Sequence, residues 1–357
     1  MTDSHAVVNL EILKNNLKLL KDFASLPALP AIKANAYGHG AIRVAKTLEN
    51  DVVGFAVATP FEALELRDAG ISTDIVLLTP APAEKLETLI KNRISFVVSS
   101  FEQVEAISKF KQNTKVHLKL NTGLNRLGAR ESDAAKILLE VARSKLTLEG
   151  VMTHLVDSED LEPIHAAKQV EMLVKFLEQH KPDARFFHAA NTGGIMNQTL
   201  HCEVFNLVRP GIGLYGYAPG SDMNGILPLE PAMTVNAWVT LVKRVFPGEV
   251  ASYNAKWTAT TQTTLATVRF GYADGYPRAA SGKAKVEILG QVFPVVGRIC
   301  MDQILVDIGE LEIPIGTPVT IFGNSSITAE SVAGWAGTNA YEILTSVGNR
   351  LERVYQT

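Results

Sequence analysis

Short apolar runs alternate with helical patterns along the first 220 residues of the chain. The runs that suit buried strands are Pro30–Ala34, Val52–Ala58, Asp74–Leu78, Ser95–Val98, Lys115–Leu120, Leu148–Thr153, Phe186–Ala190 and Val204–Val208. The helical patterns include Phe61–Asp68, Pro82–Lys91, Phe101–Lys111, Glu131–Ser144 and Ile164–Gln179. Strands that alternate with helices predict a parallel sheet. Eight strands in about 190 residues favour an N-terminal (β/α)8 TIM barrel over an open sheet, which would carry a glycine-rich phosphate turn.

The pattern changes near Pro228, where closely spaced runs rich in Val, Thr and Ile begin. These runs are Val235–Val245, Thr263–Phe270, Ala284–Leu289, Val292–Val296, Gln303–Ile308 and Thr317–Phe322. Gly or Pro turns separate them, which predicts a mostly antiparallel C-terminal β-domain. A helix is expected at Ala329–Ala336, before a last strand-like stretch. The fold class is therefore α/β, with a barrel followed by a β-domain.

The N-terminal segment Asn9–Phe23 has leucines at helical spacing with lysines between them. This pattern predicts an amphipathic helix rather than the apolar core of a signal peptide. No apolar run approaches the roughly 18 residues of a membrane span. We therefore expect a cytoplasmic protein without a membrane partner.

Composition excludes several classes of protein. The 357 residues favour two domains, and 34 Lys+Arg against 37 Asp+Glu give a net charge of −3. This balance lacks the basic footprint of a nucleic-acid-binding protein. The chain has only two cysteines, Cys202 and Cys300, and this small number excludes a disulfide scaffold or a cysteine-rich metal site.

Lys33 is the first candidate for chemistry, in the segment AIKANAYGHG. A lysine inside an apolar strand loses hydration, which lowers its pKa and makes the amine nucleophilic. Such lysines form Schiff bases with carbonyls, including pyridoxal 5'-phosphate (PLP). Lys33, Asn35 and Tyr37 alternate, so a strand would place them on one face, ahead of a turn at Gly38. The alternative is a lysine at a strand end that reaches water.

Polar residues also end or follow the later predicted strands. His117 and Lys119 share one face of the fifth strand, and Arg126 lies beyond a glycine turn. An arginine there suits bidentate capture of a carboxylate, although it could equally be an exposed loop residue. His154 and His188 end two other strands, which favours a site at the C-terminal face of the barrel over isolated structural histidines.

A glycine-rich turn, Arg209–Gly213, follows the eighth predicted strand. Its backbone N–H groups can hold a phosphate, as the loops after strands seven and eight of barrels often do. In the β-domain, Ser252–Trp257 and Gly271–Arg278 contain tyrosines, and a phenol beside cationic groups can act as a base. Tyrosines are also common in strands and turns. The eight histidines show no metal-ligand spacing, so we expect no metal.

The order of these motifs resembles alanine racemase, a PLP enzyme of fold type III with an N-terminal barrel and a C-terminal β-domain. The resemblance covers almost the whole chain, and its best single marker is the Lys33 segment. It implies that residues 11–228 form the PLP-binding barrel. Residues 1–10 and 229–357 would form the β-domain.

The resemblance also implies roles for individual residues. Lys33 and Tyr253 are the implied catalytic residues. The implied cofactor-binding residues are Lys33, Tyr37, His154, Asn191, Thr192, Arg209, Gly211, Ile212 and Tyr341. Those implied to bind or border the substrate are Arg126, Tyr272, Met301 and Asp302. Lys119 matches a lysine that is often carbamylated and orients Arg126, while His154 matches the histidine that links Arg209 to Tyr253.

The implied reaction is the interconversion of L-alanine and D-alanine by a two-base mechanism, an isomerase activity. Lys33 would serve the D-alanine proton and Tyr253 the L-alanine proton, on opposite faces of the Schiff base between substrate and PLP. Arg209 would face the pyridine nitrogen and, as a permanent cation, leave that nitrogen unprotonated. The resemblance further implies a head-to-tail homodimer in which Tyr253 reaches the partner subunit's barrel.

Small departures and competing interpretations accompany the resemblance. Asn121, Leu124, Thr192 and Asn254 stand where aspartate, methionine, serine and glycine are common. A decarboxylase of the same fold type would place an acid where Arg209 stands, and a PLP carrier would not need Tyr253. A racemase for a larger amino acid is a further alternative. Supply of D-alanine for peptidoglycan precursors and its degradation are both compatible with the sequence.

Overall fold

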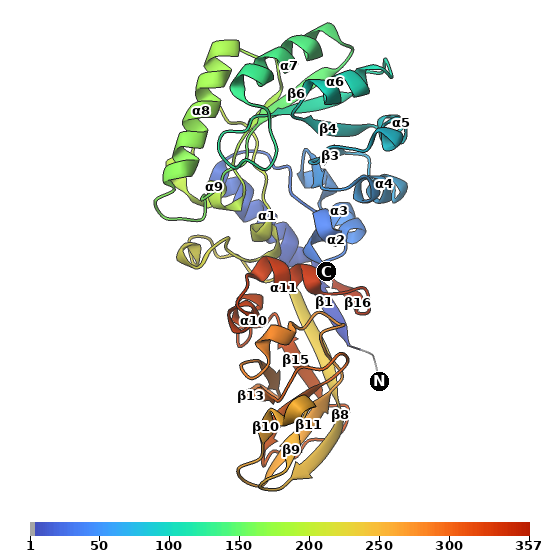
Figure 1. Cartoon of the computed structure of the whole chain (residues 1–357), viewed down its shortest axis with the longest axis vertical. Helices are drawn as coiled ribbons and strands as arrows, with labels where there is room; N and C mark the ends of the chain where they lie inside the picture. The colour runs from blue at the N-terminus through green and yellow to red at the C-terminus, as the bar shows by residue number, and fades with distance from the viewer. Residues whose placement is uncertain (1–3) are drawn as a thin grey trace. The chain divides into compact units, whose positions relative to one another are not determined.

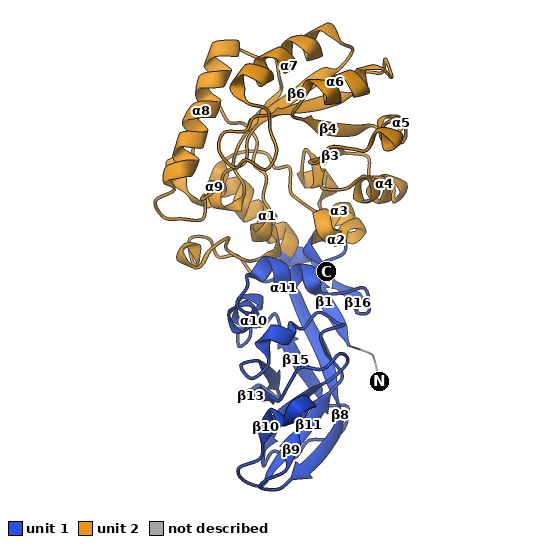
Figure 2. Ribbon diagram, in the orientation of Figure 1, with its two compact units in different colours: residues 1–12, 37–40, 231–357 blue, residues 13–36, 41–230 orange. Residues whose placement is uncertain are grey.

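The computed structural model describes residues 4–357 of the chain, which divide into two compact units (Figure 1, Figure 2). The barrel unit contains Leu13–Ala36 and Ala41–Glu230. The β unit contains the described residues up to Ile12, together with Tyr37–Gly40 and Pro231–Thr357. The expectation that residues 1–3 belong to the β-domain lies outside the described residues.

Six parallel strands form the sheet of the barrel unit, and each pairs with the next one along the chain. They are β2 (Gly54–Val57), β3 (Asp74–Leu77), β4 (Ile94–Val98), β5 (Lys115–Lys119), β6 (Thr147–Met152) and β7 (Phe186–His188). All residues of β2 and β4 are buried, as expected for parallel strands that are covered on both faces. Each of these strands lies within two residues of its predicted bounds.

Two extended segments, residues 27–32 and 206–210, close this sheet into a barrel. Backbone hydrogen bonds join them to each other and to the two edge strands. Written donor first, these bonds include Leu29 N–H to Val208 O (2.8 Å), Ile32 N–H to Ala56 O (3.0 Å) and Asn206 N–H to Phe187 O (3.1 Å). The predicted barrel of eight parallel strand segments is therefore confirmed, although the last segment is less regular than the predicted strand Val204–Val208.

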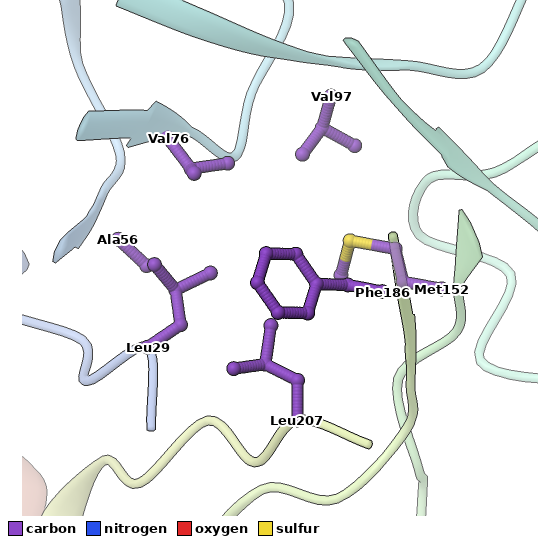
Figure 3. Close-up of a cluster of buried hydrophobic side chains, with 7 residues drawn as sticks. All are labelled: Leu29, Ala56, Val76, Val97, Met152, Phe186 and Leu207. Atoms are coloured by element: carbon purple, nitrogen blue, oxygen red, sulfur yellow. The ribbon is translucent and has the colours of Figure 1, made fainter. Parts of the chain in front are cut away.

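A layer of apolar side chains fills the barrel interior (Figure 3). Its members are Leu29, Ala56, Val76, Val97, Met152, Phe186 and Leu207. They come from strands β2, β3, β4, β6 and β7 and from both closing segments, and they surround the ring of Phe186. Burial of one large apolar side chain stabilises a fold by about 1.5–3 kcal/mol. The interior is thus a packed core at this layer, and the buried polar side chains on the same strands include His117, Lys119 and His188.

Helices connect the strands of the barrel unit. The α-helices are α1 (Leu10–Ala24), α2 (Lys33–Tyr37), α3 (Ala41–Leu48), α4 (Pro60–Asp68), α5 (Leu86–Lys91), α6 (Phe101–Ser108), α7 (Glu131–Arg143), α8 (Ile164–His180) and α9 (Thr192–Met196). The short 3₁₀ helices are η1 (Glu49–Asp51), η2 (Ala83–Lys85), η3 (Gln198–Leu200), η4 (Ile212–Tyr215) and η5 (Ser221–Met223). The predicted helix Pro82–Lys91 divides into η2 and α5. Within residues 4–357, no helix combines the length and apolar character needed to cross a membrane.

The first predicted strand is wrong beyond Ile32. Residues 34–37 all have φ between 51° and 54°, so α2 is a left-handed helical turn rather than extended backbone. Lys33, Asn35 and Tyr37 therefore do not share one face of a strand. Gly38 and Gly40 continue with φ of 82° and 95°, which glycine adopts without steric cost.

The β unit contains an eight-stranded, mostly antiparallel sheet in the order β11-β14-β13-β12-β15-β8-β1-β16. Its strands are β1 (His5–Asn9), β8 (Met233–Val245), β11 (Thr263–Val268), β12 (Lys285–Ile288), β13 (Gln291–Val296), β14 (Ile304–Gly309), β15 (Pro318–Phe322) and β16 (Glu352–Gln356). Strand β8 is long enough to pair with β1 and β15 through its first half and with β11 through its second half. The predicted antiparallel character is confirmed.

Smaller elements complete the β unit. They are β9 (Val250–Ala251), β10 (Trp257–Thr258), η6 (Tyr253–Ala255), η7 (Arg278–Ala280), α10 (Ala329–Ala336) and α11 (Ala340–Ser346). Helix α10 has the predicted bounds. Thr328, directly before it, is the N-cap, and its hydroxyl accepts a hydrogen bond from Ser331 N–H.

Candidate active site

Two side chains hold the left-handed turn that begins at Lys33. Glu62 accepts a hydrogen bond from Ala34 N–H (2.6 Å), directly after the lysine, and also caps the start of α4. Asn35 Oδ1 accepts from Ala41 N–H at 2.8 Å, beyond the turn. Left-handed backbone costs roughly 1–2 kcal/mol per non-glycine residue. These bonds offset part of that cost and fix the backbone from which the Lys33 side chain extends.

The Lys33 amine has a lowered pKa. Burial is the main cause, because a charged ammonium loses hydration, and the positive charge of Arg126 adds to the effect. Glu62 acts in the opposite direction, since its negative charge favours the protonated amine. The structure thus gives Lys33 the electrostatic character expected of a nucleophilic lysine, at a turn and not inside a strand.

Lys119, at the end of β5, is buried among other cations. Its pKa is lowered to about 8, mainly by burial and then by the charges of Arg209, Arg126 and Lys33, in that order. Four basic side chains of the barrel unit therefore lie close enough to affect one another. Such a cluster disfavours further positive charge and favours anionic groups.

Arg209, near the end of the second closing segment (residues 206–210), is buried and held at several points. Its Nη1 donates to His188 Nδ1 at 2.8 Å, and its Nη2 donates to the backbone oxygens of Thr153 (2.8 Å) and Ala189 (2.9 Å). His154 Nδ1 lies 3.4 Å from the same Nη2. Burial lowers the pKa of Arg209 to about 10, so the guanidinium is still charged near neutral pH.

The arginine determines the tautomers of the histidines around it. A guanidinium only donates hydrogen bonds, so Nδ1 of His188 must accept and its proton must lie on Nε2. That Nε2 faces His117 Nδ1 at 3.1 Å, with the two rings nearly perpendicular. Burial lowers the pKa of His117 to about 4 and that of His188 well below its ordinary value. A neutral chain of two imidazoles therefore supports the guanidinium from the barrel interior.

His154 is the third imidazole at this arginine. Its pKa is also well below the ordinary value, first because of burial and then because of the neighbouring cations. With Nδ1 turned toward Arg209, the proton of the neutral ring lies on Nε2. His154 can therefore donate one hydrogen bond from the ring edge that faces away from Arg209.

Thr192, the first residue of α9, accepts two backbone hydrogen bonds from the turn after Arg209. Gly211 N–H and Gly213 N–H donate to its Oγ1 at 3.0 and 3.2 Å. A Cβ at Gly213 would lie 2.7 Å from Thr192 Cγ2, so only glycine permits this approach. Asn191 caps α9 by accepting from Gly194 N–H at 3.0 Å. The starts of α9 and η4 thus lie side by side, joined through the Thr192 hydroxyl.

In the β unit, the segment around Cys300 brings several predicted site residues together. Cys300 O accepts from Tyr272 N–H at 3.0 Å, and Asp302 Oδ1 accepts from Arg350 Nη2 at 2.8 Å. Tyr253 belongs to a neighbouring loop and is 68 % exposed, and Met301 is 52 % exposed. Tyr253, Tyr272, Met301 and Asp302 therefore lie on adjoining loops of one unit.

Tyr37 and Tyr341 form a second group in the β unit. Their ring centroids are 6.1 Å apart, and burial raises the pKa of Tyr37 to about 12. Both phenols are therefore close in space, and that of Tyr37 stays protonated at neutral pH. The candidate residues in the barrel unit are Lys33, Lys119, Arg126, His154, Asn191, Thr192, Arg209, Gly211 and Ile212.

The sequence did not single out Glu62 or Gln169. Gln169, a buried residue of α8, donates to His154 O at 3.0 Å and accepts from Val156 N–H at 2.8 Å, so it fixes the backbone beside His154. The sequence Thr59-Pro-Phe-Glu62 does signal a capping box, with Glu at the third helical position. No local pattern indicates that the same carboxylate also binds the Lys33 turn.

Comparison with known proteins places the chain in a family. Residues 8–219 match the model of the alanine racemase N-terminal domain, and residues 232–355 match that of the C-terminal domain. The alanine racemase of Deinococcus deserti is 40 % identical over 98 % of both chains, and that of Deinococcus radiodurans is 38 % identical over 98 % of this chain and 97 % of its own. A solved alanine racemase of Clostridium difficile 630 is 36 % identical, with a TM-score of 0.94 over 100 % of this chain and 96 % of its own. This chain therefore belongs to the alanine racemase family and is an enzyme of that family.

Proposed function

We propose that this enzyme interconverts L-alanine and D-alanine with PLP as its cofactor. The observation that carries the proposal is Lys33, whose amine has a lowered pKa beside Arg126. In a chain that belongs to the alanine racemase family over both of its domains, this is the lysine expected to hold the cofactor. The proposed reaction needs no metal.

The candidate residues, most of them in the barrel unit, fit the chemical groups of PLP. Thr192 and the backbone at Gly211 and Ile212 supply hydroxyl and amide donors for a phosphate, and Tyr37 and Tyr341 would add phenols. The cluster of basic side chains favours an anionic ligand. Arg209 would donate to the pyridine nitrogen, with His154 and Asn191 supporting this part of the site. When bound, PLP supplies an electron sink for the negative charge that develops at the substrate Cα.

Two residues would move the α-proton. Lys33 Nζ would take or return the proton of D-alanine, and Tyr253 Oη would take or return that of L-alanine. Two bases on opposite faces are the simplest arrangement for inverting a carbon, because neither base must cross the substrate plane. Arg126 would hold the substrate carboxylate, and Tyr272, Met301 and Asp302 would border the substrate.

Arg209 would also limit side reactions. Its charge persists near neutral pH, and its contacts with His188 and two backbone oxygens prevent it from turning away. A donor that is already protonated leaves the pyridine nitrogen without a proton. Arg209 would therefore favour return of the proton to the substrate Cα over side reactions such as transamination.

We also propose that Lys119 is carbamylated. Its pKa of about 8 leaves a substantial fraction of neutral amine near neutral pH, and only the neutral amine can attack CO₂. The amine nitrogen bonds to the carbon of CO₂ and releases one proton, which yields a carbamate anion. Such an anion would relieve the repulsion among the surrounding cations and would orient Arg126.

The assembly follows from the same proposal. Residues 11–228 would bind PLP, and residues 1–10 and 229–357 would present Tyr253 to the partner subunit's barrel in a head-to-tail homodimer. Two-fold dimers are the commonest assembly of soluble proteins. We propose a cytoplasmic location, with D-alanine supplied for peptidoglycan precursors.

A direct experiment separates this function from its competitors. Purified protein is loaded with PLP and incubated with L-alanine, L-serine or L-lysine, and the enantiomers are measured by chiral chromatography. Conversion of alanine in both directions is the expected result. Release of CO₂ would favour a decarboxylase, and faster conversion of lysine or serine would favour a racemase for another amino acid.

A further inference from the structure

We propose that Ser252 is a positioning residue. Its side chain holds the strained loop that carries Tyr253, which is residues 252–256 between β9 and β10. The inference rests on the proposed function for the role of Tyr253. It rests on the structure of the β unit for everything else.

The backbone around Tyr253 is strained. Ser252 has φ 63° and ψ 179°, a region that is essentially restricted to glycine, and Asn254 and Ala255 have φ of 61° and 46°. Non-glycine residues keep such conformations only where the surrounding contacts determine them. The loop therefore needs an anchor close to Ser252.

The two ends of the loop are anchored by strands. Strands β9 and β10 pair antiparallel, with Ala251 opposite Trp257. Ala251 and Ala259 belong to a buried apolar cluster with Leu265. These contacts fix where the loop begins and ends, whereas Tyr253 itself is 68 % exposed.

The Ser252 hydroxyl supplies the anchor at the strained residue. Its Oγ donates to Arg298 O at 2.8 Å and accepts from Arg298 N–H at 3.1 Å, so it uses both backbone groups of one residue. Cys300 Sγ lies 3.6 Å from the same oxygen. The segment that receives Ser252 is thus the one that continues to Met301 and Asp302.

The segment that Ser252 contacts, around Gly297 and Arg298, leaves room for its side chain. Gly297 has φ of 69°, and a Cβ there would lie 2.5 Å from Ser252 Cβ and 3.0 Å from Ala251 O. A side chain at position 297 would therefore push the Tyr253 loop away even with the hydroxyl present. The hydroxyl of Ser252 and the absence of a side chain at Gly297 both affect the direction in which the Tyr253 side chain extends from the loop.

The experiment compares Ser252→Ala, Ser252→Gly and a matched control, Ser281→Ala. Ser281 also pairs with two backbone groups, donating to Arg278 O at 2.6 Å and accepting from Ile299 N–H at 3.1 Å, but it follows η7 and does not belong to the loop of Tyr253. Amide hydrogen exchange is measured first, without cofactor or substrate. Loss of one hydrogen bond corresponds to roughly a fivefold change in an opening equilibrium. Arg298 N–H should exchange about fivefold faster in both Ser252 variants, and Ile299 N–H should do so only in Ser281→Ala.

Racemisation by the PLP-loaded enzyme is measured second. Misplacement of a catalytic group by about 1 Å can cost about 100-fold in rate, so both Ser252 variants should lose about 10- to 100-fold in kcat/KM. Their α-deuterium isotope effect should rise with L-alanine and not with D-alanine, because only the step at Tyr253 is slowed. A loss of folded protein alone would lower kcat/KM and leave both isotope effects unchanged, and that result would contradict the proposal.

Ser252→Gly keeps the test decisive if Ser252→Ala fails to fold, because glycine adopts φ 63° without strain. Full activity in Ser252→Gly would overturn the proposal. Failure of the wild-type enzyme to racemise alanine would overturn the proposed function instead. The exchange of Arg298 N–H would still report on the hydroxyl anchor in that case.

Discussion

The segments of Lys33 and Tyr253 share left-handed backbone but differ in their surroundings. Lys33 precedes four consecutive residues with φ of 51–54°, in the barrel unit. Tyr253 lies between Ser252 and Asn254, with φ of 63° and 61°, in the β unit. Lys33 is partly buried and its amine has a lowered pKa, whereas Tyr253 is 68 % exposed.

The difference separates two ways of preparing a reactive group. The barrel unit supplies the desolvation and the cationic neighbours that make Lys33 nucleophilic. The β unit fixes the backbone of Tyr253 through Ser252 and leaves the phenol exposed. Under the proposed head-to-tail dimer, the environment of the phenol would come from the partner subunit. Changes at Lys33 should therefore act on cofactor binding, and changes at Tyr253 only on proton transfer.

Lys33→Ala should have the largest effect. Removal of the amine removes both a proposed covalent attachment for PLP and a proposed base, and a positioned base alone contributes about 10²- to 10⁴-fold. We expect racemisation to fall by at least about 10⁴-fold and the visible absorbance of bound PLP to change, measured by chiral chromatography and spectroscopy. Lys109→Ala, at an exposed lysine paired with Glu105, is the control and should change neither. Retention of the wild-type spectrum by Lys33→Ala would contradict the assignment.

Tyr253→Phe should have the next largest effect. It removes one hydroxyl from an exposed ring, so the free energy of unfolding should change by less than about 0.5 kcal/mol. We expect kcat/KM to fall about 10²- to 10⁴-fold while the absorbance of bound PLP is unchanged. A loss of PLP absorbance in this variant would contradict the proposal that Tyr253 acts only on proton transfer and not on cofactor binding.

Glu62→Gln should have an intermediate effect. The carboxylate accepts hydrogen bonds from Ala34 N–H and, through its other oxygen, from Ala58 and Thr59 N–H. A carboxamide keeps only one accepting oxygen, so one of these donors loses its partner at a cost of about 1–3 kcal/mol. Thermal unfolding and PLP titration should both show weakening. Glu65→Gln, one turn along α4, is the control, and equal effects of the two variants would contradict a special role for Glu62.

Lys119→Arg should have the smallest effect on activity. Lys119 should also give the free energy of unfolding a distinct pH dependence. Its pKa falls from 10.5 to about 8 on folding, so the folded chain binds this proton less tightly than the unfolded chain. The free energy of unfolding should therefore rise with pH between about 8 and 10.5. With ¹³C-bicarbonate, the NMR signal of a carbamate should grow as pH rises through about 8 and be absent from Lys119→Arg. A signal of equal size in both proteins would exclude Lys119 as its source.

Most of the fold followed from the sequence because hydrophobic periodicity reports burial directly. Strands β2 to β7 and helix α10 lie at or within two residues of their predictions. The segment after Ile32 did not follow, since an alternating polar pattern resembles a strand. Only long-range bonds, such as that of Glu62 to Ala34 N–H, make its left-handed backbone possible.

The candidate site was predicted in its residue types more than in its connections. His117 and Lys119 were expected to share one face of their strand, and both are buried. The link from Arg209 through His188 to His117 joins segments that are up to 92 residues apart in the sequence. A sequence pattern cannot encode such a contact. The strain at Ser252 is likewise invisible in the sequence, because serine is an ordinary loop residue.

The most direct measurement for the two-base account is the α-deuterium isotope effect of Tyr253→Phe in both directions. Equal solution free energies of the enantiomers require kcat/KM to fall equally for both, so rates alone cannot assign a face to each base. If Tyr253 serves L-alanine, its loss makes cleavage of the L-alanine Cα–H bond rate-limiting. The account predicts a larger isotope effect on kcat/KM with deuterated L-alanine than with deuterated D-alanine. Equal isotope effects for the two enantiomers would contradict it.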